Sequence, residues 1–280
     1  MSLLKTEFEH LIFTIWMVFT ALALAVGSFP VLREISSHGK RASSDKEDKK
    51  NDLNMTQFLM YTLKPMLRVP KRFFLHFYIL GAAASAVIIA ICLQKRRKFT
   101  EMIPLIIFLL HTWRRLWECI YITEFGVSTM HICGYLAGIA HYILVPISCL
   151  SINIRRSSQE QLYFALMLFA IASIEQSRIH YMLFRVKRTT LSIMKPNAIF
   201  LYDVPRGAWF NYVCCPHYSA EILIYFSLYM LDFQSYSSFG LFCWVTCNLS
   251  VVSRQQLKWY TDKFLHRCPH NWKSIIPYIL

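Results

Sequence analysis

Ionisable side chains stand inside segments of the sequence that are otherwise apolar. His111, Arg114, Arg115 and Glu118 follow the apolar run that begins near residue 103. On a helix, His111, Arg115 and Glu118 would share one face. An ionisable group at bilayer depth is costly unless it is paired or hydrated, so each one is a candidate functional residue. A buried Arg–Glu pair that only locks two helices together is the alternative.

Two further polar pairs have helical spacing. Pro216 fits the first position of a helix and places His217 and Glu221 one turn apart, directly before an apolar run. Glu221 has little reason to stand there unless it accepts hydrogen bonds from a ligand or a neighbouring helix. Gln176 and His180 close another apolar run at i,i+4 spacing. We interpret both pairs as candidate binding residues, with a satisfied polar contact between helices as the alternative.

Long apolar runs must position these side chains. The 280 residues are 55% hydrophobic and only 16% charged, whereas a soluble domain is about a quarter charged. Several runs approach the roughly 20 residues that cross a hydrocarbon core. The sequence therefore predicts an all-α, multi-spanning membrane helix bundle that forms one domain over residues 1–280. We place about seven transmembrane helices near residues 11–32, 73–93, 103–121, 130–152, 161–180, 208–231 and 237–253.

Basic residues predict the orientation of this bundle. With seven crossings, 21 lysines and arginines lie on one side and 7 on the other. The positive-inside rule then places the N-terminus outside and the C-terminal tail in the cytosol. The cluster Lys95–Lys98 violates this rule, and a re-entrant or interfacial segment would account for it. Residues 36–54 are polar and of low complexity, and we expect them to form a flexible loop.

Composition and motifs argue against several other classes of protein. The net charge of +14 comes from basic residues that flank apolar spans, so anionic lipid headgroups explain it better than nucleic acid does. The nine cysteines include no CxxC, and Pro269 interrupts the spacing of His266 and His270, so we expect no metal site. A GxGxxG turn and a P-loop are both absent. Any nucleotide must therefore be held by scattered side chains between helices. Gly134 and Gly138 have the spacing that permits close approach of two helices.

Four segments, in this order, resemble the steroid 5α-reductase family, and within it the branch of polyprenol reductases. They are residues 69–78 (VPKRFFLHFY), 111–118 (HTWRRLWE), 205–221 (PRGAWFNYVCCPHYSAE) and the tail that includes residues 259–264 (WYTDKF) and 276–278 (IPY). The resemblance implies a seven-helix enzyme of the endoplasmic reticulum membrane. Such an enzyme uses NADPH to saturate the α-isoprene unit of a polyprenoid lipid, polyprenal or polyprenol. Its product feeds dolichol synthesis and hence protein N-glycosylation.

The resemblance also implies a cofactor cavity on the cytosolic side, lined largely by the C-terminal part of the chain, residues 200–280. The cofactor-binding positions that match the family are Gln176, His180, Lys187, Tyr202, His217, Glu221 and Tyr260. We expect His217 and Glu221 to position the nicotinamide, and Lys187, Arg206 and Lys263 to neutralise the phosphates. The chain departs from the family at Leu257, where a histidine is usual, and at Lys187, where an arginine is usual. At Thr112 the steroid-reducing members have a tyrosine.

Elementary chemistry favours polyprenal over polyprenol as the direct substrate. Hydride added to an alkene carbon leaves negative charge on the neighbouring carbon, and an α,β-unsaturated aldehyde spreads that charge onto its oxygen. We predict that His111, Arg114 and Arg115, ordered by Glu118, stabilise this charge. Two other functions stay open at this point. One is a membrane methyltransferase of the isoprenylcysteine type, and the other is a non-catalytic membrane protein.

Overall fold

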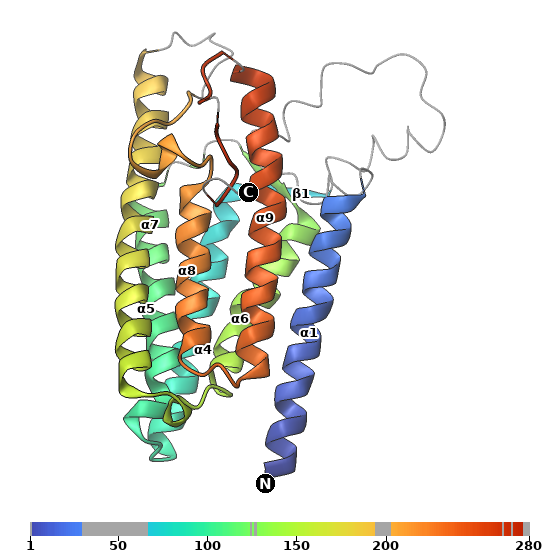
Figure 1. Cartoon of the computed structure of the whole chain (residues 1–280), viewed down its shortest axis with the longest axis vertical. Coiled ribbons are helices and arrows are strands. Elements are labelled where there is room, and N and C mark those ends of the chain that lie inside the picture. Colours follow the sequence, from blue (N-terminus) through green and yellow to red (C-terminus); the bar gives the residue numbers. More distant parts are fainter. Residues whose placement is uncertain are drawn as a thin grey trace.

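Seven α-helices run side by side as one bundle within the part of the chain that the structure describes (Figure 1). This computed structural model describes residues 2–29, 67–123, 125, 128–193, 203–264, 266–269 and 271–276, without the side chains of residues 2–5 and 187–193. The helices are α1 (Ser2–Ser28), α4 (Phe74–Gln94), α5 (Phe99–Tyr121), α6 (Ile132–Cys149), α7 (Gln159–Ile193), α8 (Pro216–Met230) and α9 (Tyr236–Phe264). The predicted all-α bundle is confirmed.

The predicted spans match these helices in order, but several boundaries differ. The helices α7 and α9 extend beyond the predicted ends at residues 180 and 253, because hydropathy marks only the apolar part of a helix and not its polar continuation. The predicted start at residue 208 is wrong, since a short 3₁₀ helix, η4 (Ala208–Asn211), precedes α8. Gly207 has a φ of 88° there, which glycine adopts without steric cost, and it turns the chain away from a continuous helix. Residues 30–32 and the predicted loop 36–54 lie outside the described residues.

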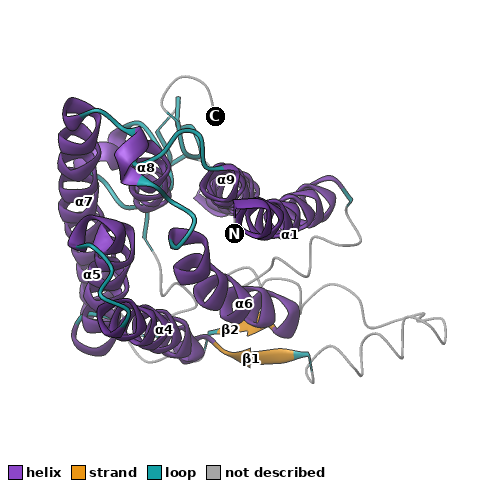
Figure 2. Ribbon diagram, turned by 90° about the horizontal axis from the view of Figure 1, so that it is seen from below, coloured by secondary structure: helices purple, strands orange, loops and turns teal. Residues whose placement is uncertain are grey.

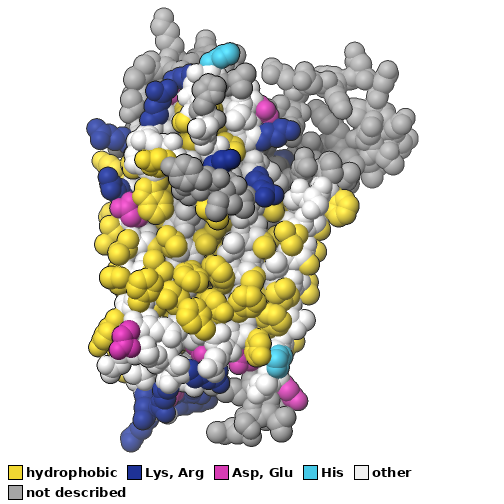
Figure 3. All heavy atoms as spheres, viewed as in Figure 1, with side chains coloured by type: hydrophobic (Ala, Val, Ile, Leu, Met, Phe, Trp, Pro, Cys, Tyr) yellow, Lys and Arg dark blue, Asp and Glu magenta, His cyan; other side chains and the backbone are white. Residues whose placement is uncertain are grey.

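The surface of the bundle is that of a multi-pass membrane protein. Four described helices are long and apolar enough to cross a membrane, and they contain Thr6–Ser28, Lys71–Gln94, Ile132–Cys149 and Gln159–Val186. Hydrophobic side chains form a broad band across the face shown in Figure 3, and most of the Lys and Arg side chains gather beyond its two edges. The helix α8 has only 15 residues, and α5 and α9 carry more polar residues, which include part of the site described below.

A glycine of α6 lets an aromatic side chain of α4 pack directly against the backbone of α6. Seen from one end, α6 lies between α4 and α9, while α1 packs on the outer side of α9 (Figure 2). A Cβ atom placed on Gly138 of α6 would come within 2.6 Å of the Phe77 ring of α4. The predicted role in close helix packing is therefore confirmed at Gly138, whereas Gly134 lines the cavity described below.

Short connections fix the two ends of the bundle. At one end, β1 (Arg68–Pro70) pairs antiparallel with β2 (Thr129–His131) and ties the starts of α4 and α6 together. At the other end, Lys95–Lys98 forms an exposed turn between the antiparallel helices α4 and α5, and Arg97 lies 3.5 Å from Glu101. This basic cluster is therefore a helix connection and not a re-entrant segment.

Candidate active site

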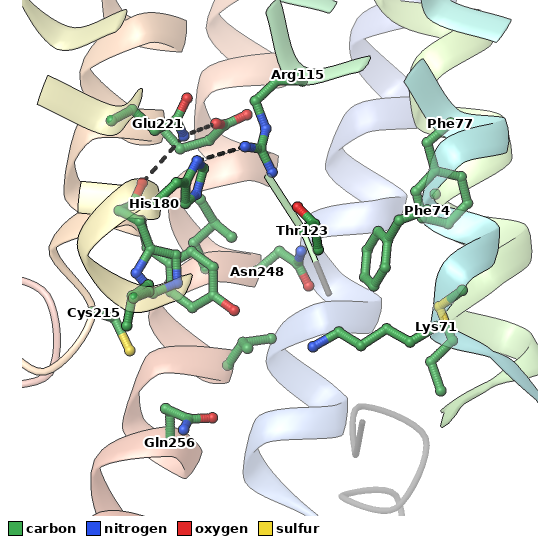
Figure 4. A pocket seen from close by; sticks show the side chains of 18 of the residues that line it. Lys71, Phe74, Phe77, Arg115, Thr123, His180, Cys215, Glu221, Asn248 and Gln256 are labelled. Carbon is green, nitrogen blue, oxygen red and sulfur yellow. Dashed lines mark hydrogen bonds between the residues drawn. The ribbon is translucent and has the colours of Figure 1, made fainter. Parts of the chain in front are cut away.

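A cavity of about 510 Å³ lies among α4, α5, α6, α7, α8 and α9, toward the end of the bundle that carries β1 and β2. Its walls differ in chemistry. Figure 4 shows Arg115, His180 and Glu221 on one side of the view and the rings of Phe74 and Phe77 on the other. One wall can therefore hold polar groups of a ligand, and the other can hold an apolar chain.

Glu118 is the centre of the charged network behind the polar wall. Its Oε1 accepts hydrogen bonds from Arg114 Nη1 at 2.6 Å and from Ser177 Oγ at 2.5 Å. Its Oε2 accepts from Arg115 Nη1 and lies 2.8 Å from His180 Nδ1. The carboxylate is buried, so the donors of Arg114, Arg115 and Ser177 replace the water that it loses. The predicted Arg–Glu pair thus joins α5 to α7 through side chains.

The network continues from α5 and α7 to the start of α8. The Gln176 amide accepts a hydrogen bond from Arg114 and donates one to Glu221, so it links the two helices. It also donates to the backbone carbonyl of His217 at 3.3 Å. On the other side, His111 Nε2 lies 3.3 Å from Glu221 Oε1. The glutamate that the sequence singled out is held by side chains from two other helices.

The charges of this network balance. Arg114 and Arg115 contribute two cations, and Glu118 and Glu221 contribute two carboxylates. A balanced, hydrogen-bonded group of charges is the form in which ionised residues are tolerated within a membrane. The Glu221 side chain is 16% exposed and faces the cavity, whereas that of Glu118 is 1% exposed. Glu221 is therefore the carboxylate of this network that a ligand can reach.

The chain before α8 is held in place by the C-terminal tail. Cys214 N donates to the carbonyl of Lys273 at 2.7 Å, and Trp272 Nε1 donates to the carbonyl of Phe210 at 2.6 Å. Ser219 Oγ donates to the carbonyl of Ile275 at 2.5 Å. Because these bonds secure both sides of Pro216, α8 starts at a defined point, as predicted, and directs its first turn toward the cavity.

A second buried network lies on the side of the cavity formed by α6, α8 and α9. Trp244 Nε1 donates to His141 Nδ1 at 3.1 Å, and His141 Nε2 lies 2.7 Å from the hydroxyl of Tyr225. The Trp16 ring of α1 packs edge-on against His141, and its Nε1 donates to Ser148 at 2.9 Å. This network consists of aromatic and neutral polar groups, so it needs no counter-charge.

The structure brings some of the predicted site residues to the cavity wall. Those that line it are Arg115, Gln176, His180, His217, Glu221 and Tyr260. His111, Arg114 and Glu118 lie behind this wall and contact the residues that form it. Two predicted positions, Tyr202 and the side chain of Lys187, lie outside the described residues.

Two of the predicted phosphate-binding residues are not among the described residues that line the cavity. Arg206 Nη2 contacts the carbonyl of Arg267 at 3.5 Å, and Lys263 Nζ lies 5.2 Å from the centre of the Trp259 ring. Neither residue lines the cavity. Lys71 does line it, and Figure 4 shows its side chain extending into the same space as Asn248.

On the face of α9 that lines the cavity, sequence reasoning singled out Tyr260 alone. Asn248, Val252 and Gln256 line the cavity on the same face, at four-residue spacing. This i,i+4 pattern could have identified the face, but the predicted helix ended at residue 253. The hydroxyls of Tyr78 and Tyr225 were also not considered, since a tyrosine among apolar residues is an ordinary member of a helix core.

Comparisons with known proteins agree with these features. Residues 119–280, more than half of the chain, match the family described as 3-oxo-5-alpha-steroid 4-dehydrogenase. The polyprenal reductase of Saccharomyces cerevisiae is 30% identical over 218 residues, which cover 76% of this chain and 75% of that protein. The polyprenal reductase of Caenorhabditis elegans is 26% identical over 258 residues, with 78% and 82% covered. That of Xenopus tropicalis is 31% identical over 203 residues, with 65% and 62% covered.

The bundle and its apolar surface define a membrane protein, and the family match and these relatives indicate a reductase. The chain belongs to the 3-oxo-5-alpha-steroid 4-dehydrogenase family, that is, the steroid 5α-reductases. The resemblance that the four sequence segments indicated is therefore confirmed.

Proposed function

We propose that this protein is a polyprenal reductase that uses NADPH to saturate the α-isoprene double bond of polyprenal. The product would enter dolichol synthesis for protein N-glycosylation. The relatives named above support the substrate, and the family supports NADPH as the reductant. We further propose that the protein resides in the endoplasmic reticulum membrane, with its C-terminal tail in the cytosol.

One observation carries this proposal, namely the division of a single cavity into a polar wall and an aromatic wall. Glu221 and Gln176 present a carboxylate and an amide, which suit the carboxamide of a nicotinamide ring. Phe74 and Phe77 present apolar surface, which suits an isoprene unit. A hydride donor and a lipid aldehyde would thus meet between the two walls.

The residues that would hold NADPH are those of the polar wall. His217 and Glu221 would position the nicotinamide, with Gln176 orienting Glu221. Lys71 and Tyr260 would face the remainder of the dinucleotide from the other end of the cavity lining. NADPH supplies the hydride when it is bound, and the protein supplies orientation and exclusion of water.

The Glu221→Gln variant tests this assignment. We expect it to lower NADPH-dependent reduction of polyprenal in microsomes at least 100-fold, about 3 kcal/mol of barrier at 1.36 kcal/mol per tenfold, because Glu221 loses its charge and its contact with His111. Saturated product is measured by mass spectrometry and protein abundance by immunoblot. Glu175→Gln is the matched control, because Glu175 pairs with the exposed Arg178 at 3.4 Å and does not line the cavity.

Full activity in the Glu221 variant would remove this carboxylate from the site. A separate binding measurement distinguishes the methyltransferase alternative. Purified protein should bind NADPH and should not bind S-adenosylmethionine.

A further inference from the structure

Two tyrosine side chains line the cavity, and each hydroxyl oxygen already accepts a hydrogen bond. Arg115 Nη2 lies 2.9 Å from the Tyr78 hydroxyl, and the guanidinium carbon lies 5.1 Å from the centre of the Tyr78 ring. A guanidinium can only donate, so the Tyr78 oxygen is the acceptor in this bond. The proton of the Tyr78 hydroxyl must then point elsewhere, and Tyr78 lines the cavity.

The same reasoning applies to Tyr225 through a chain of three groups. The indole N–H of Trp244 can only donate, so His141 Nδ1 at 3.1 Å accepts its proton. A protonated imidazole would set two donors against each other at this atom, so His141 is neutral. Its proton lies on Nε2, which donates to the Tyr225 oxygen at 2.7 Å. The Tyr225 hydroxyl thus also directs its own proton elsewhere, and Tyr225 lines the same cavity.

We propose that the hydroxyls of Tyr78 and Tyr225 together bind the carbonyl oxygen of the α,β-unsaturated aldehyde, and that both are catalytic residues. This proposal rests on the proposed function. It changes the expected role of Arg115, which becomes a positioning residue that acts through Tyr78.

The reaction explains why two donors are useful. A hydride from NADPH adds to the β-carbon and leaves NADP⁺, the alkene electron pair moves into the bond between the α-carbon and the carbonyl carbon, and the carbonyl pair moves onto oxygen. The resulting enolate oxygen carries the negative charge and accepts hydrogen bonds from Tyr78 and Tyr225. A proton from water then adds to the α-carbon and restores the carbonyl group. Donors fixed before the reaction stabilise this charge without having to reorient.

The two hydroxyls differ in strength. Tyr78 accepts from a cation that Glu118 holds in place, so its hydroxyl is polarised and becomes the stronger donor. Tyr225 accepts from a neutral imidazole. We therefore expect Tyr78 to contribute more than Tyr225 to the rate.

Three variants test the proposal in purified, detergent-solubilised protein supplied with polyprenal and NADPH. Tyr78→Phe should lower kcat about 10²- to 10³-fold, as loss of one oxyanion donor does, with KM and the Kd for NADPH nearly unchanged. Tyr225→Phe should lower kcat by a smaller factor. Tyr163→Phe is the control, because the Tyr163 side chain is 66% exposed on the outer face of α7 and does not line the cavity. It should retain the native kcat.

A kinetic isotope effect separates a catalytic role from a structural one. With NADPH deuterated at the transferred position, the isotope effect on kcat should increase in Tyr78→Phe, because hydride transfer becomes slower than the other steps. A native kcat in Tyr78→Phe would overturn the proposal. A lower kcat with weaker NADPH binding and an unchanged isotope effect would also overturn it. Failure of the native protein to reduce polyprenal would instead refute the proposed function.

Discussion

The two buried networks beside the cavity both hold helices together through polar contacts, but one uses charged groups and the other uses neutral groups. The network around Glu118 joins α5, α7 and α8 through two arginines, two carboxylates and the Gln176 amide. The network around His141 joins α1, α6, α8 and α9 through neutral hydrogen bonds and stacked rings. Both hold helices together in a medium that offers no water to a polar group.

The two networks differ in how much free energy of unfolding is lost when one member is removed. Removing one member of the charged network leaves an ion buried without its counter-ion, whereas removing one member of the neutral network leaves only an unsatisfied dipole. The charged network therefore fixes the relative positions of its helices tightly. This suits a site that must hold a hydride donor and a substrate in contact. The neutral network can lose a bond at a smaller cost.

The largest effect is expected for Glu118→Ala. This change leaves Arg114 and Arg115 without their shared carboxylate, and we expect it to lower the free energy of unfolding by about 3–5 kcal/mol. Unfolding in detergent micelles, followed by tryptophan fluorescence, measures it. Glu101→Ala is the control, since Glu101 makes only exposed ion pairs with Arg97 and Arg155, and such pairs contribute about 0–1 kcal/mol. An equal loss of unfolding free energy in Glu118→Ala and Glu101→Ala would contradict the special role of the buried charged network.

A smaller effect is expected for His141→Phe in the neutral network. The variant removes the partner of both Trp244 and Tyr225 while keeping an aromatic ring, and we expect a loss of about 1–3 kcal/mol. The same unfolding measurement applies, with His10→Phe as the control because His10 is exposed on α1. A loss of unfolding free energy as large as that of Glu118→Ala would show that charge does not account for the difference between the two networks.

The smallest effect is expected at the edge of the neutral network. Trp16→Phe keeps the ring contact with His141 but removes the hydrogen bond from Nε1 to Ser148. We expect the free energy of unfolding to decrease by about 1–2 kcal/mol, from the loss of one such bond and the smaller volume that phenylalanine fills at this fully buried position. Ser148 keeps its own bond to the carbonyl of Leu144, so kcat should not change. A measurable loss of kcat would indicate that α1 influences the site through α6.

Much of the fold could be predicted because membrane insertion depends on local composition. Four helices are long and apolar enough to define a span by themselves, and shorter apolar runs between them indicate the other three. The polar residues that interrupt these runs were also informative. Gln176, His180, His217 and Glu221 do meet at one cavity, since a polar group in a membrane must find a partner. Pro216 defined the start of α8 because its missing N–H is tolerated there.

Partners across helices could not be predicted, because they depend on how each helix is rotated and shifted against its neighbours. Local spacing indicated that Arg114 and Glu118 pair, yet only packing of α5 against α7 adds Ser177 and His180 to the same carboxylate. The same geometry leaves Arg206 and Lys263 out of the cavity lining and brings Gln256 to it.

The sequence by itself determined the class of protein, the helices and the family, since hydropathy and motif order are properties of the linear chain. The tertiary structure alone decided which side chains form the cavity and which lie behind it. It also decided the direction of the hydrogen bonds at Tyr78 and Tyr225, because that direction follows from the donors, Arg115 and Trp244, that packing places at the start of each chain of bonds.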